Sequence, residues 1–411
     1  MKFLAGLALV LPLASAAAVT PLEKKITYDG FKAFRIATHN DPASIKKKIA
    51  NIAAIPFNLD NSEHLDVAIP AGDVSKFEKL GLETSILHED LGADIAEEGT
   101  FAPYESDLTW FNSYHTFADH QQFIRDLQSN FPSNSELINA GNSYGGRSLL
   151  GIHLWGSGGK GSKPAIYWHV NMRQFVVEYL TYQLIDGYQK NDATVKALLD
   201  KYDFYILPIV NPDGFAYTQT NDRLWRKNRQ PRSGSTCIGT DINRNWPFNW
   251  QLPGGASTNY CSETYKGQAA GDTPEMVALK AYTDRLAAGR GIKLFIDWHS
   301  YGQYILLPYG YDCSARASNH ARQMTLATNT ANTIAQSYGT RFTYGPSCST
   351  LYATTGSAPD YLTGAAGAEV AWTIELRPSG SAGGGFVLPA AQILPSAIEQ
   401  WNGIKYLLAN V

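Results

Sequence analysis

"PAIYWHVNMRQFVVEYLTYQLI", residues 164–185, is the stretch that decides the fold. Its first part, residues 165–170, is a short and mostly apolar run, which is typical of a strand buried on both faces. Residues 174–188 continue with apolar side chains at helical spacing and predict an amphipathic helix. A buried strand that leads directly into a helix is typical of parallel sheets, because their crossover connections place helices on the sheet faces.

The same alternation of strands and helices continues to the end of the chain. Helices are predicted within residues 113–132 and 274–289, and buried strands within residues 148–156, 202–215, 292–310 and 371–377. We therefore predict that residues 106–411 form an α/β domain, a three-layer α/β/α sandwich with a mixed sheet.

The residues before this domain predict two further segments. Residues 1–16 combine Lys2, an apolar run and Ala14-Ser15-Ala16, which is the pattern of a signal peptide that is cleaved during secretion. The run is too short to span a bilayer as a helix. Residues 26–90 predict a small α+β (ferredoxin-like) module with the order strand–helix–strand–helix–strand, and an acidic linker follows at residues 92–107.

Composition excludes some partners. The chain has 411 residues, a formal charge of -3 and 44% hydrophobic residues. A nucleic-acid-binding protein would need a strongly basic face, and no later run is long and apolar enough to cross a membrane. We expect a secreted, extracellular monomer that binds neither nucleic acid nor membranes.

Four cysteines indicate disulfide bonds in a secreted chain. They are Cys237, Cys261, Cys313 and Cys348. Three pairings are possible, and we favour bonds between neighbours in sequence. A cysteine metal site would need a closely spaced Cys-x-x-Cys pair, which the chain lacks.

Charged side chains gather after one predicted strand. "NDRLWRKNRQ", residues 221–230, contains Arg226 and follows a turn at the end of the strand in residues 202–215. It is either a solvated basic loop or an anion-binding loop. Asn243 and Arg244 follow in "GTDINRNW", where a guanidinium fork could bind a carboxylate.

Two more polar residues interrupt apolar strands. His299 ends the first strand of "IKLFIDWHSYGQ"; it is either a core or surface histidine or a metal ligand at a strand end. Glu375 lies within "AWTIELRPSG", where a carboxylate is costly without a partner. It is either half of a buried ion pair with Arg377 or a general base with a shifted pKa.

Taken in order, the four motifs "NPDGFAYT…DRLWRKNR", "TDINRNW", "WHSYGQYILLPYGY" and "IELRPSG" resemble those of secreted fungal zinc metallocarboxypeptidases of the carboxypeptidase A/B family. The resemblance covers nearly the whole chain. It implies that residues 17–105 are an inhibitory prosegment, and that residues 106–411 are a catalytic domain that removes single C-terminal residues from peptides with the help of one Zn²⁺.

The resemblance also implies roles for individual residues. His299 matches a zinc ligand, Glu375 the general base, and Arg226 the residue that stabilises the oxyanion. Asn243 and Arg244 match the clamp that holds the C-terminal carboxylate of the substrate.

Three further features follow from the resemblance. Tyr352 matches the mobile tyrosine that closes over the substrate, and Cys237–Cys261 matches the family's commonest disulfide. Relatives that cut basic residues carry an acid at the position of Pro359. An uncharged residue there implies a preference for apolar or aromatic C-terminal residues.

The two other zinc ligands of the family, a His and a Glu three residues later, are missing. They should lie between "PAIYWHVN" and "VVEYLTYQL". In one alignment the segment is absent from this chain; in another, residues 171–175 stand against it, so that Asn171 replaces the His and Gln174 the Glu. Neutral amides are poor zinc ligands. His169 and Glu178 are nearby substitutes, but the first is expected on the strand and the second on the helix surface.

Two explanations remain for this loss. The sequence could lack a short piece through a wrong exon boundary or alternative splicing, or the protein could be an inactive pseudo-carboxypeptidase that binds peptide C-termini. We favour the first, because the flanking segments and Glu375, Arg226 and Arg244 are retained.

Overall fold

The computed structural model describes residues 25–58, 63–101, 104–171, 173–379 and 385–411. The predicted signal peptide, residues 1–16, lies outside this range. In the described part of the chain, no helix combines the length and the hydropathy that crossing a membrane requires.

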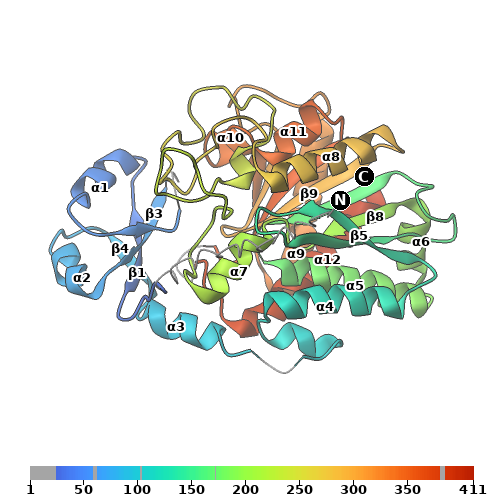
Figure 1. Ribbon diagram of the computed structural model, residues 1–411, viewed down its shortest axis with the longest axis horizontal. Helices are drawn as coiled ribbons and strands as arrows, with labels where there is room; N and C mark the ends of the chain where they lie inside the picture. Colours follow the sequence, from blue (N-terminus) through green and yellow to red (C-terminus); the bar gives the residue numbers. More distant parts are fainter. Residues whose placement is uncertain (1–24, 59–62, 102–103, 172, 380–384) are drawn as a thin grey trace, which may run out of the picture.

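The large domain is built on an eight-stranded mixed sheet, as predicted (Figure 1). Its order is β11-β10-β12-β9-β7-β8-β6-β5, and the four central strands β12, β9, β7 and β8 run parallel. The strands are β5 (Ser135–Asn142), β6 (Ser148–Leu154), β7 (Ala165–Val170), β8 (Asp203–Leu207), β9 (Ile292–Ser300), β10 (Tyr304–Leu307), β11 (Thr343–Pro346) and β12 (Val370–Leu376).

Helices cover both faces of this sheet and bury a separate apolar core on each face. One face carries α4 (Phe117–Asn130), α5 (Gln174–Gln189), α6 (Ala193–Lys201), α9 (His320–Tyr338) and α12 (Ile393–Asn410). The other carries α8 (Pro274–Ala288) and α11 (Ala358–Gly364). The predicted three-layer arrangement is confirmed, because each helix buries its apolar stripe against one sheet face.

The stretch at residues 164–185 folds as predicted, with a short connection between β7 and α5. Arg173 closes this connection in the left-handed region, at φ 68°, and precedes α5 without a side-chain cap. Its buried guanidinium donates to the carbonyl oxygens of Gly385 (3.0 Å) and Phe386 (3.1 Å). The tight turn therefore directs the Arg173 guanidinium into the large domain rather than into solvent.

The N-terminal module has the predicted alternation of strands and helices. Its four-stranded sheet has the order β2-β3-β1-β4. The elements are β1 (Lys32–Ala37), α1 (Pro42–Lys48), β2 (Ile55–Pro56), β3 (His64–Ile69), α2 (Ala71–Glu78) and β4 (Thr84–His88).

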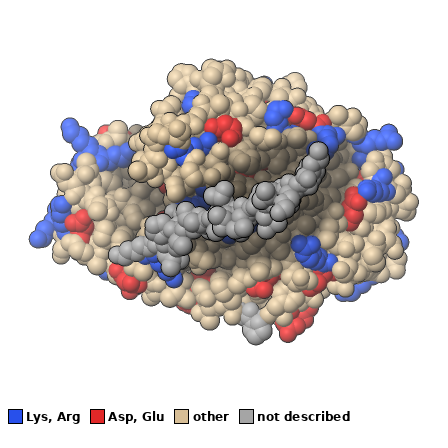
Figure 2. Space-filling view, viewed as in Figure 1, with Lys and Arg blue, Asp and Glu red and all other residues tan. Residues whose placement is uncertain are grey.

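Figure 2 shows acidic and basic side chains interspersed over one face of the molecule, with basic ones gathered at the end formed by α1 and α2.

The predicted linker at residues 92–107 is wrong in its first half, which is a helix. α3 (Leu91–Glu98) begins after Asp90, whose side chain accepts from the Ala93 backbone N–H. Leu91 is fully buried against the module. The segment is acidic and lacks a long apolar period, so the cap and one buried leucine gave too weak a signal.

Both disulfides join the neighbours in sequence that the analysis favoured. Cys237 is bonded to Cys261, and Cys313 to Cys348. The second bond ties the loop after β10 to α10 (Ser347–Thr350). It thus fixes the chain just before Tyr352.

A buried carboxylate joins the small module to the large domain. Asp66 on β3 accepts hydrogen bonds from Arg35 Nε (2.7 Å) and Nη2 (2.6 Å). It also accepts one from the hydroxyl of Tyr301 (2.5 Å), which follows β9 in the large domain. The fully buried side chain of Asp66 therefore bonds both within the small module and to the large domain.

Asp66→Ala is expected to lower the free energy of unfolding by about 3 kcal/mol, because it leaves the Arg35 guanidinium desolvated without its partner. Urea denaturation of the full chain measures this. The control is Glu89→Ala, which removes the exposed partner of Lys32 and should leave the unfolding midpoint unchanged. Equal effects of the two substitutions on the free energy of unfolding would contradict the role of Asp66 as the buried partner of Arg35.

Candidate active site

The carboxyl ends of the four parallel strands bring the predicted site residues to one edge of the sheet. His299 on β9 and Glu375 on β12 are register partners. Asn171 directly follows β7, and its backbone N–H donates to the Trp298 carbonyl. A crevice beyond parallel strand ends is the usual ligand position in such sheets.

His299 is buried among neutral amides and one carboxylate. Its Nε2 lies 2.8 Å from Asp297 Oδ2, 3.1 Å from Asn243 Nδ2 and 3.3 Å from Asn171 Nδ2. Burial alone would lower the pKa of His299, but the Asp297 carboxylate raises it above its ordinary value. The site therefore favours an imidazole that keeps its proton.

Asp297 is shared between two histidines. Its Oδ1 lies 3.0 Å from His169 Nε2, while Oδ2 faces His299. Burial would raise the pKa of Asp297, but the two imidazoles together lower it. His169 lies on β7, as the sequence analysis expected, and faces Asp297 there, so it does not replace a lost metal ligand.

Gln174 and Glu178 point into a different network. Gln174 Nε2 lies 2.8 Å from His120 Nε2, and His120 Nδ1 lies 2.7 Å from Glu178 Oε1. Trp110 Nε1 donates to the other Glu178 oxygen at 3.1 Å. Glu178 is fully buried, so its expected position on the helix surface is wrong. Its partners hold α4 and α5 together instead.

The residues present do not fit a catalytic zinc ion, which needs about three protein ligands and an open position. Within the described residues, no group of three His, Cys, Asp or Glu side chains is placed to hold a metal. The amide nitrogens of Asn171 and Asn243 face the His299 ring where ligand atoms would be needed. His299 is the one residue at this pocket that the sequence analysis predicted as a metal ligand.

Arg226 and Arg244 lie beside this pocket around one acidic residue. Asp241 Oδ2 is 2.9 Å from Arg226 Nε and 4.0 Å from Arg244 Nη1. Burial would lower the pKa of Arg226, and Asp241 raises it overall. Arg244 Nε is buried and has no hydrogen-bond partner among the described residues. This guanidinium has a donor left for a ligand.

Glu375 is half-buried near the same arginines. Its Oε2 has no hydrogen-bond partner in the described part of the chain. Burial raises the pKa of Glu375, while His299 and Arg226 partly oppose this. A carboxylate with a raised pKa and a free oxygen is suited to accept a proton.

The remaining predicted residues line the other side of the site. The Asn243 side-chain oxygen accepts from the Ala358 backbone N–H at 2.9 Å, which ties Asn243 to α11 and its buried Pro359. Tyr352 is half-buried and lies close enough to Arg226 for the two side chains to interact electrostatically. Its side chain therefore lies on the same side of the sheet edge as Arg226.

The sequence analysis did not single out two acids. Asp241 organises the arginines, although its position two residues before Asn243 was a usable signal. Asp360, next to Pro359, accepts from the backbone N–H groups of Gly310 and Tyr311. Burial raises the pKa of Asp360 to about 7.

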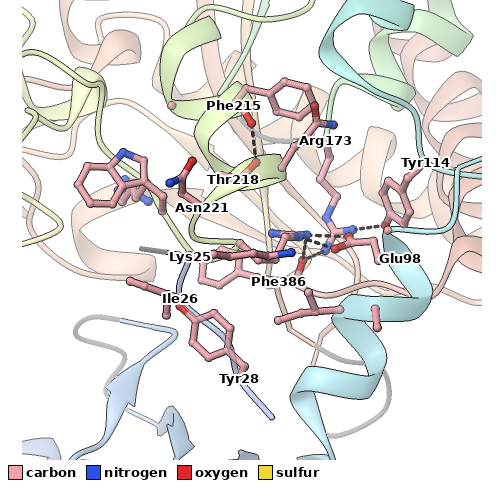
Figure 3. A pocket seen from close by; sticks show the side chains of 18 of the residues that line it. Lys25, Ile26, Tyr28, Glu98, Tyr114, Arg173, Phe215, Thr218, Asn221 and Phe386 are labelled. Carbon is pink, nitrogen blue, oxygen red and sulfur yellow. Dashed lines mark hydrogen bonds and ion pairs between the residues drawn. The ribbon is translucent and has the colours of Figure 1, made fainter. Parts of the chain in front are cut away.

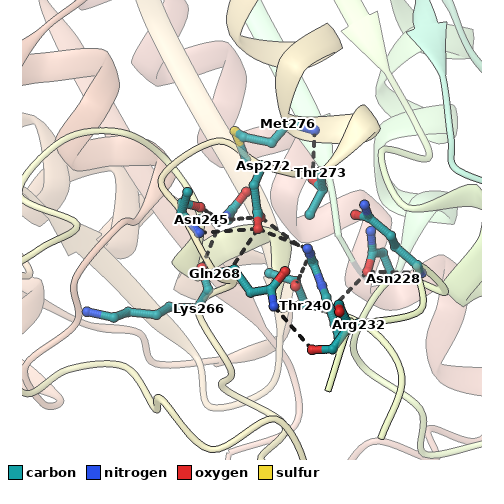
Figure 4. A network of polar contacts seen from close by, with 12 residues as sticks. Asn228, Arg232, Thr240, Asn245, Lys266, Gln268, Asp272, Thr273 and Met276 are labelled. Carbon is teal, nitrogen blue, oxygen red and sulfur yellow. Dashed lines mark hydrogen bonds and ion pairs between the residues drawn. The ribbon is translucent and has the colours of Figure 1, made fainter. Parts of the chain in front are cut away.

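A polar network fixes the loop that carries Asn243 and Arg244 (Figure 4). Asp272 accepts from Arg232 Nη1 (2.9 Å) and from Asn245 Nδ2 (3.1 Å). Asn245 also donates to the Lys266 carbonyl at 2.8 Å. Because Asn245 directly follows η2 (Ile242–Arg244), these bonds set the position of Arg244 relative to the sheet.

Known proteins share this fold and much of this sequence. The metallocarboxypeptidase A-like protein of Trichophyton verrucosum is 40% identical over 93% of this chain and 94% of its own length. Metallocarboxypeptidase A of Arthroderma otae is 41% identical, covering 97% and 96%. Zinc carboxypeptidase A 1 of Anopheles gambiae is 33% identical, covering 93% and 89%.

Solved structures agree with this match. Thrombin-activatable fibrinolysis inhibitor superposes with a TM-score of 0.83 at 25% identity, over 93% of this chain and 98% of that one. Carboxypeptidase A of Helicoverpa armigera superposes with a TM-score of 0.79 at 24% identity, over 93% of this chain and 98% of that one, and shares its fold. The family model described as zinc carboxypeptidase matches residues 120–403. The chain belongs to the zinc carboxypeptidase family, whose members are metallocarboxypeptidases.

Proposed function

We propose that the site recognises the C-terminal residue of peptides. A longer product of the same gene, with all three zinc ligands present, would then remove that residue. The chain as given would retain the recognition half of this function. The observation that supports the proposal best is the buried Arg244, which has an unused Nε donor beside Asn243. A guanidinium fork and an amide together suit a terminal carboxylate.

The groups that would serve the reaction are also present. Arg226 is a fixed cation suited to a developing oxyanion, because Asp241 holds its Nε and its side chain is partly buried. Glu375 is suited to accept a proton, as argued from its free oxygen and raised pKa. We derive no step that involves a metal ion, since the residues around His299 do not fit one.

We propose that the peptide's C-terminal side chain is apolar or aromatic. The basis is Pro359, an uncharged and buried residue beside the clamp. The carboxylate oxygens of the neighbouring Asp360 accept hydrogen bonds from backbone N–H groups. Since the pKa of Asp360 is about 7, about half of this carboxyl group is protonated near pH 7. It therefore offers little charge to a basic side chain.

We also propose that the protein is a secreted monomeric zymogen, with a signal peptide at residues 1–16, an inhibitory prosegment at residues 17–105 and a catalytic domain at residues 106–411. Asp66 of the small module bonds to Tyr301, two residues beyond His299. The module thus lies against the strand end that carries the site. Two disulfides among the described residues fit an extracellular protein.

A second candidate is a permanent binder of peptide C-termini without turnover. The amides of Asn171 and Asn243 at His299 favour it, because they complete the pocket without a metal. The two candidates differ in whether the natural product contains the longer connection between β7 and α5.

The chain as given is expected to contain no stoichiometric zinc after purification, since His299 is its single retained ligand. Elemental analysis and hydrolysis of a blocked dipeptide check this, with the Anopheles gambiae relative as the zinc-containing control. One zinc per chain together with turnover would contradict our account of the pocket.

Arg244→Ala is expected to weaken the binding of a peptide with a free C-terminus by about tenfold to a hundredfold, because a charge-assisted bond is lost. Fluorescence anisotropy measures it on protein cleaved within residues 99–107. Arg322→Ala, which removes an exposed arginine paired with Glu369, should not change the affinity. Equally tight binding of the C-terminal amide peptide would refute a carboxylate clamp.

Release of the prosegment is expected to need a protease that does not cut after basic residues. No Lys or Arg occurs between Lys79 and Arg125, and α3 ends at Glu98 within that interval. N-terminal sequencing of the mature protein should give a start near residues 100–110. A mature protein that still begins before residue 90 would contradict removal of this module.

A further inference from the structure

The four-stranded sheet of the small module has one face turned to the large domain and one turned away from it. On the first face, Phe57 and Leu91 share an apolar cluster with Val387 of the large domain. Figure 3 shows Tyr28 and Glu98 beside a cavity of about 470 Å³ on the same side. The large domain therefore occupies this side of the module.

The other face of the sheet is covered by α1 and α2. The buried residues Ile45, Ile49 and Phe77 pack there against Phe34 and Ile36 of β1. Figure 1 places both helices at the end of the molecule that is farthest from the large domain. Their outer surfaces are therefore open to solvent in the intact chain.

Five exposed lysines gather on this outer surface, which we call the basic face (Figure 2). They are Lys46, Lys47 and Lys48 in the last turn of α1, Lys76 in the last turn of α2, and Lys79, which directly follows α2. The two helices adjoin, because Lys76 Nζ donates to the Asn51 carbonyl just beyond α1. Positive charge is thus concentrated here, although the whole chain has a formal charge of -3.

Little negative charge compensates the basic face. The two acids of α2 are Asp73, which accepts from a backbone N–H at 3.0 Å, and the exposed Glu78. Among the described residues, the side chains of Lys47, Lys48 and Lys79 have no hydrogen bond or ion pair. The end of α1 supplies at most about half a negative charge, whereas its last turn carries three lysines. Helix capping therefore accounts for only part of this set.

The composition of the basic face indicates the kind of partner. All of its cations are lysines, whose ammonium groups are hydrated point charges, and arginine forks, which suit phosphate groups, are lacking in α1 and α2. The two helices also expose no aromatic ring on which a nucleobase could stack. Ile45 and Phe77, their largest apolar residues, are buried, whereas a helix that binds a membrane surface turns such residues to the lipid. These features favour a hydrated anionic polymer.

We propose that the basic face binds an anionic polysaccharide, so that the intact chain is held on such a polymer through its small module. Lysines that contact successive acidic groups release the counterions condensed on the polymer, and binding therefore weakens as salt is added. The proposal goes beyond the recognition of peptide C-termini and does not rest on it, because the basic face lies on the side of the module away from the large domain.

The test combines Lys47→Ala, Lys48→Ala and Lys79→Ala in the full-length chain. The probe is a labelled heparin oligosaccharide, which is linear and sulfated, titrated by fluorescence anisotropy at several salt concentrations. We expect the unsubstituted chain to bind it at low salt, and the triple variant to bind it at least about tenfold more weakly. The slope of log K against log salt concentration should become shallower by about two, since each lysine releases roughly 0.7 of a counterion from a single-stranded polyanion.

A matched control removes the same charge from the large domain. Lys201, Arg290 and Arg341 are exposed cations whose side chains have no ion pair among the described residues. Their combined replacement by alanine should leave the affinity for heparin and the salt slope as in the unsubstituted chain. Thermal denaturation checks that both triple variants fold. Should the first fail to fold, Lys47→Gln alone is expected to make the slope shallower by about 0.7.

Three results would overturn the proposal. The first is no binding of heparin by the unsubstituted chain at low salt. The second is equal affinity of the two triple variants for heparin, since the effect would then not belong to the basic face. The third is lysine-dependent binding to phosphatidylserine vesicles that is at least as tight as binding to heparin, which would assign the face to membranes. No peptide takes part, so the outcome is separate from that of the Arg244→Ala experiment.

Discussion

The structure depends on a constraint of parallel sheets: strands that run in the same direction end at the same edge. β12, β9 and β7 bring Glu375, His299 and Asn171 together there, although the three are far apart in sequence. The remaining charged groups arrive on loops that polar networks fix, with Asp241 and Asp272 at their centres. A site of this kind survives the loss of single residues, because the scaffold and not the site determines where the strands end.

The pocket around His299 illustrates this tolerance. Removing a charged partner from a buried position normally leaves a costly unpaired group. Here the Asp297 carboxylate lies 2.8 Å from His299 Nε2 and balances the charge of the ring, while the amide nitrogens of Asn171 and Asn243 lie beside the same ring nitrogen. The fold therefore does not require a metal in order to satisfy its buried imidazole. Arg226 and Arg244 thus lie beside a pocket in which no group of three His, Cys, Asp or Glu side chains among the described residues is placed to hold a metal.

Much of this could be predicted from sequence. Apolar strands ending in polar residues located His299 and Glu375, and the sheet order explains why they meet. The outward position expected for Glu178 and the linker expected at α3 were wrong. In both places the structure adds a contact with a residue distant in sequence, His120 for Glu178 and Arg223 for Glu98, and at α3 the local signal was also weak. Local patterns report burial and periodicity, and they do not report which charges will meet across two modules.

The central claim is that the site keeps its carboxylate clamp while amides replace its metal seat. A crystal structure of the cleaved chain, grown with zinc and a peptide that has a free C-terminus, tests it most directly through anomalous diffraction at the zinc edge. The account predicts the peptide carboxylate on Arg244 and no anomalous peak beside His299. A peak at the His299 ring, with Asn171 displaced to admit the ion, would contradict it.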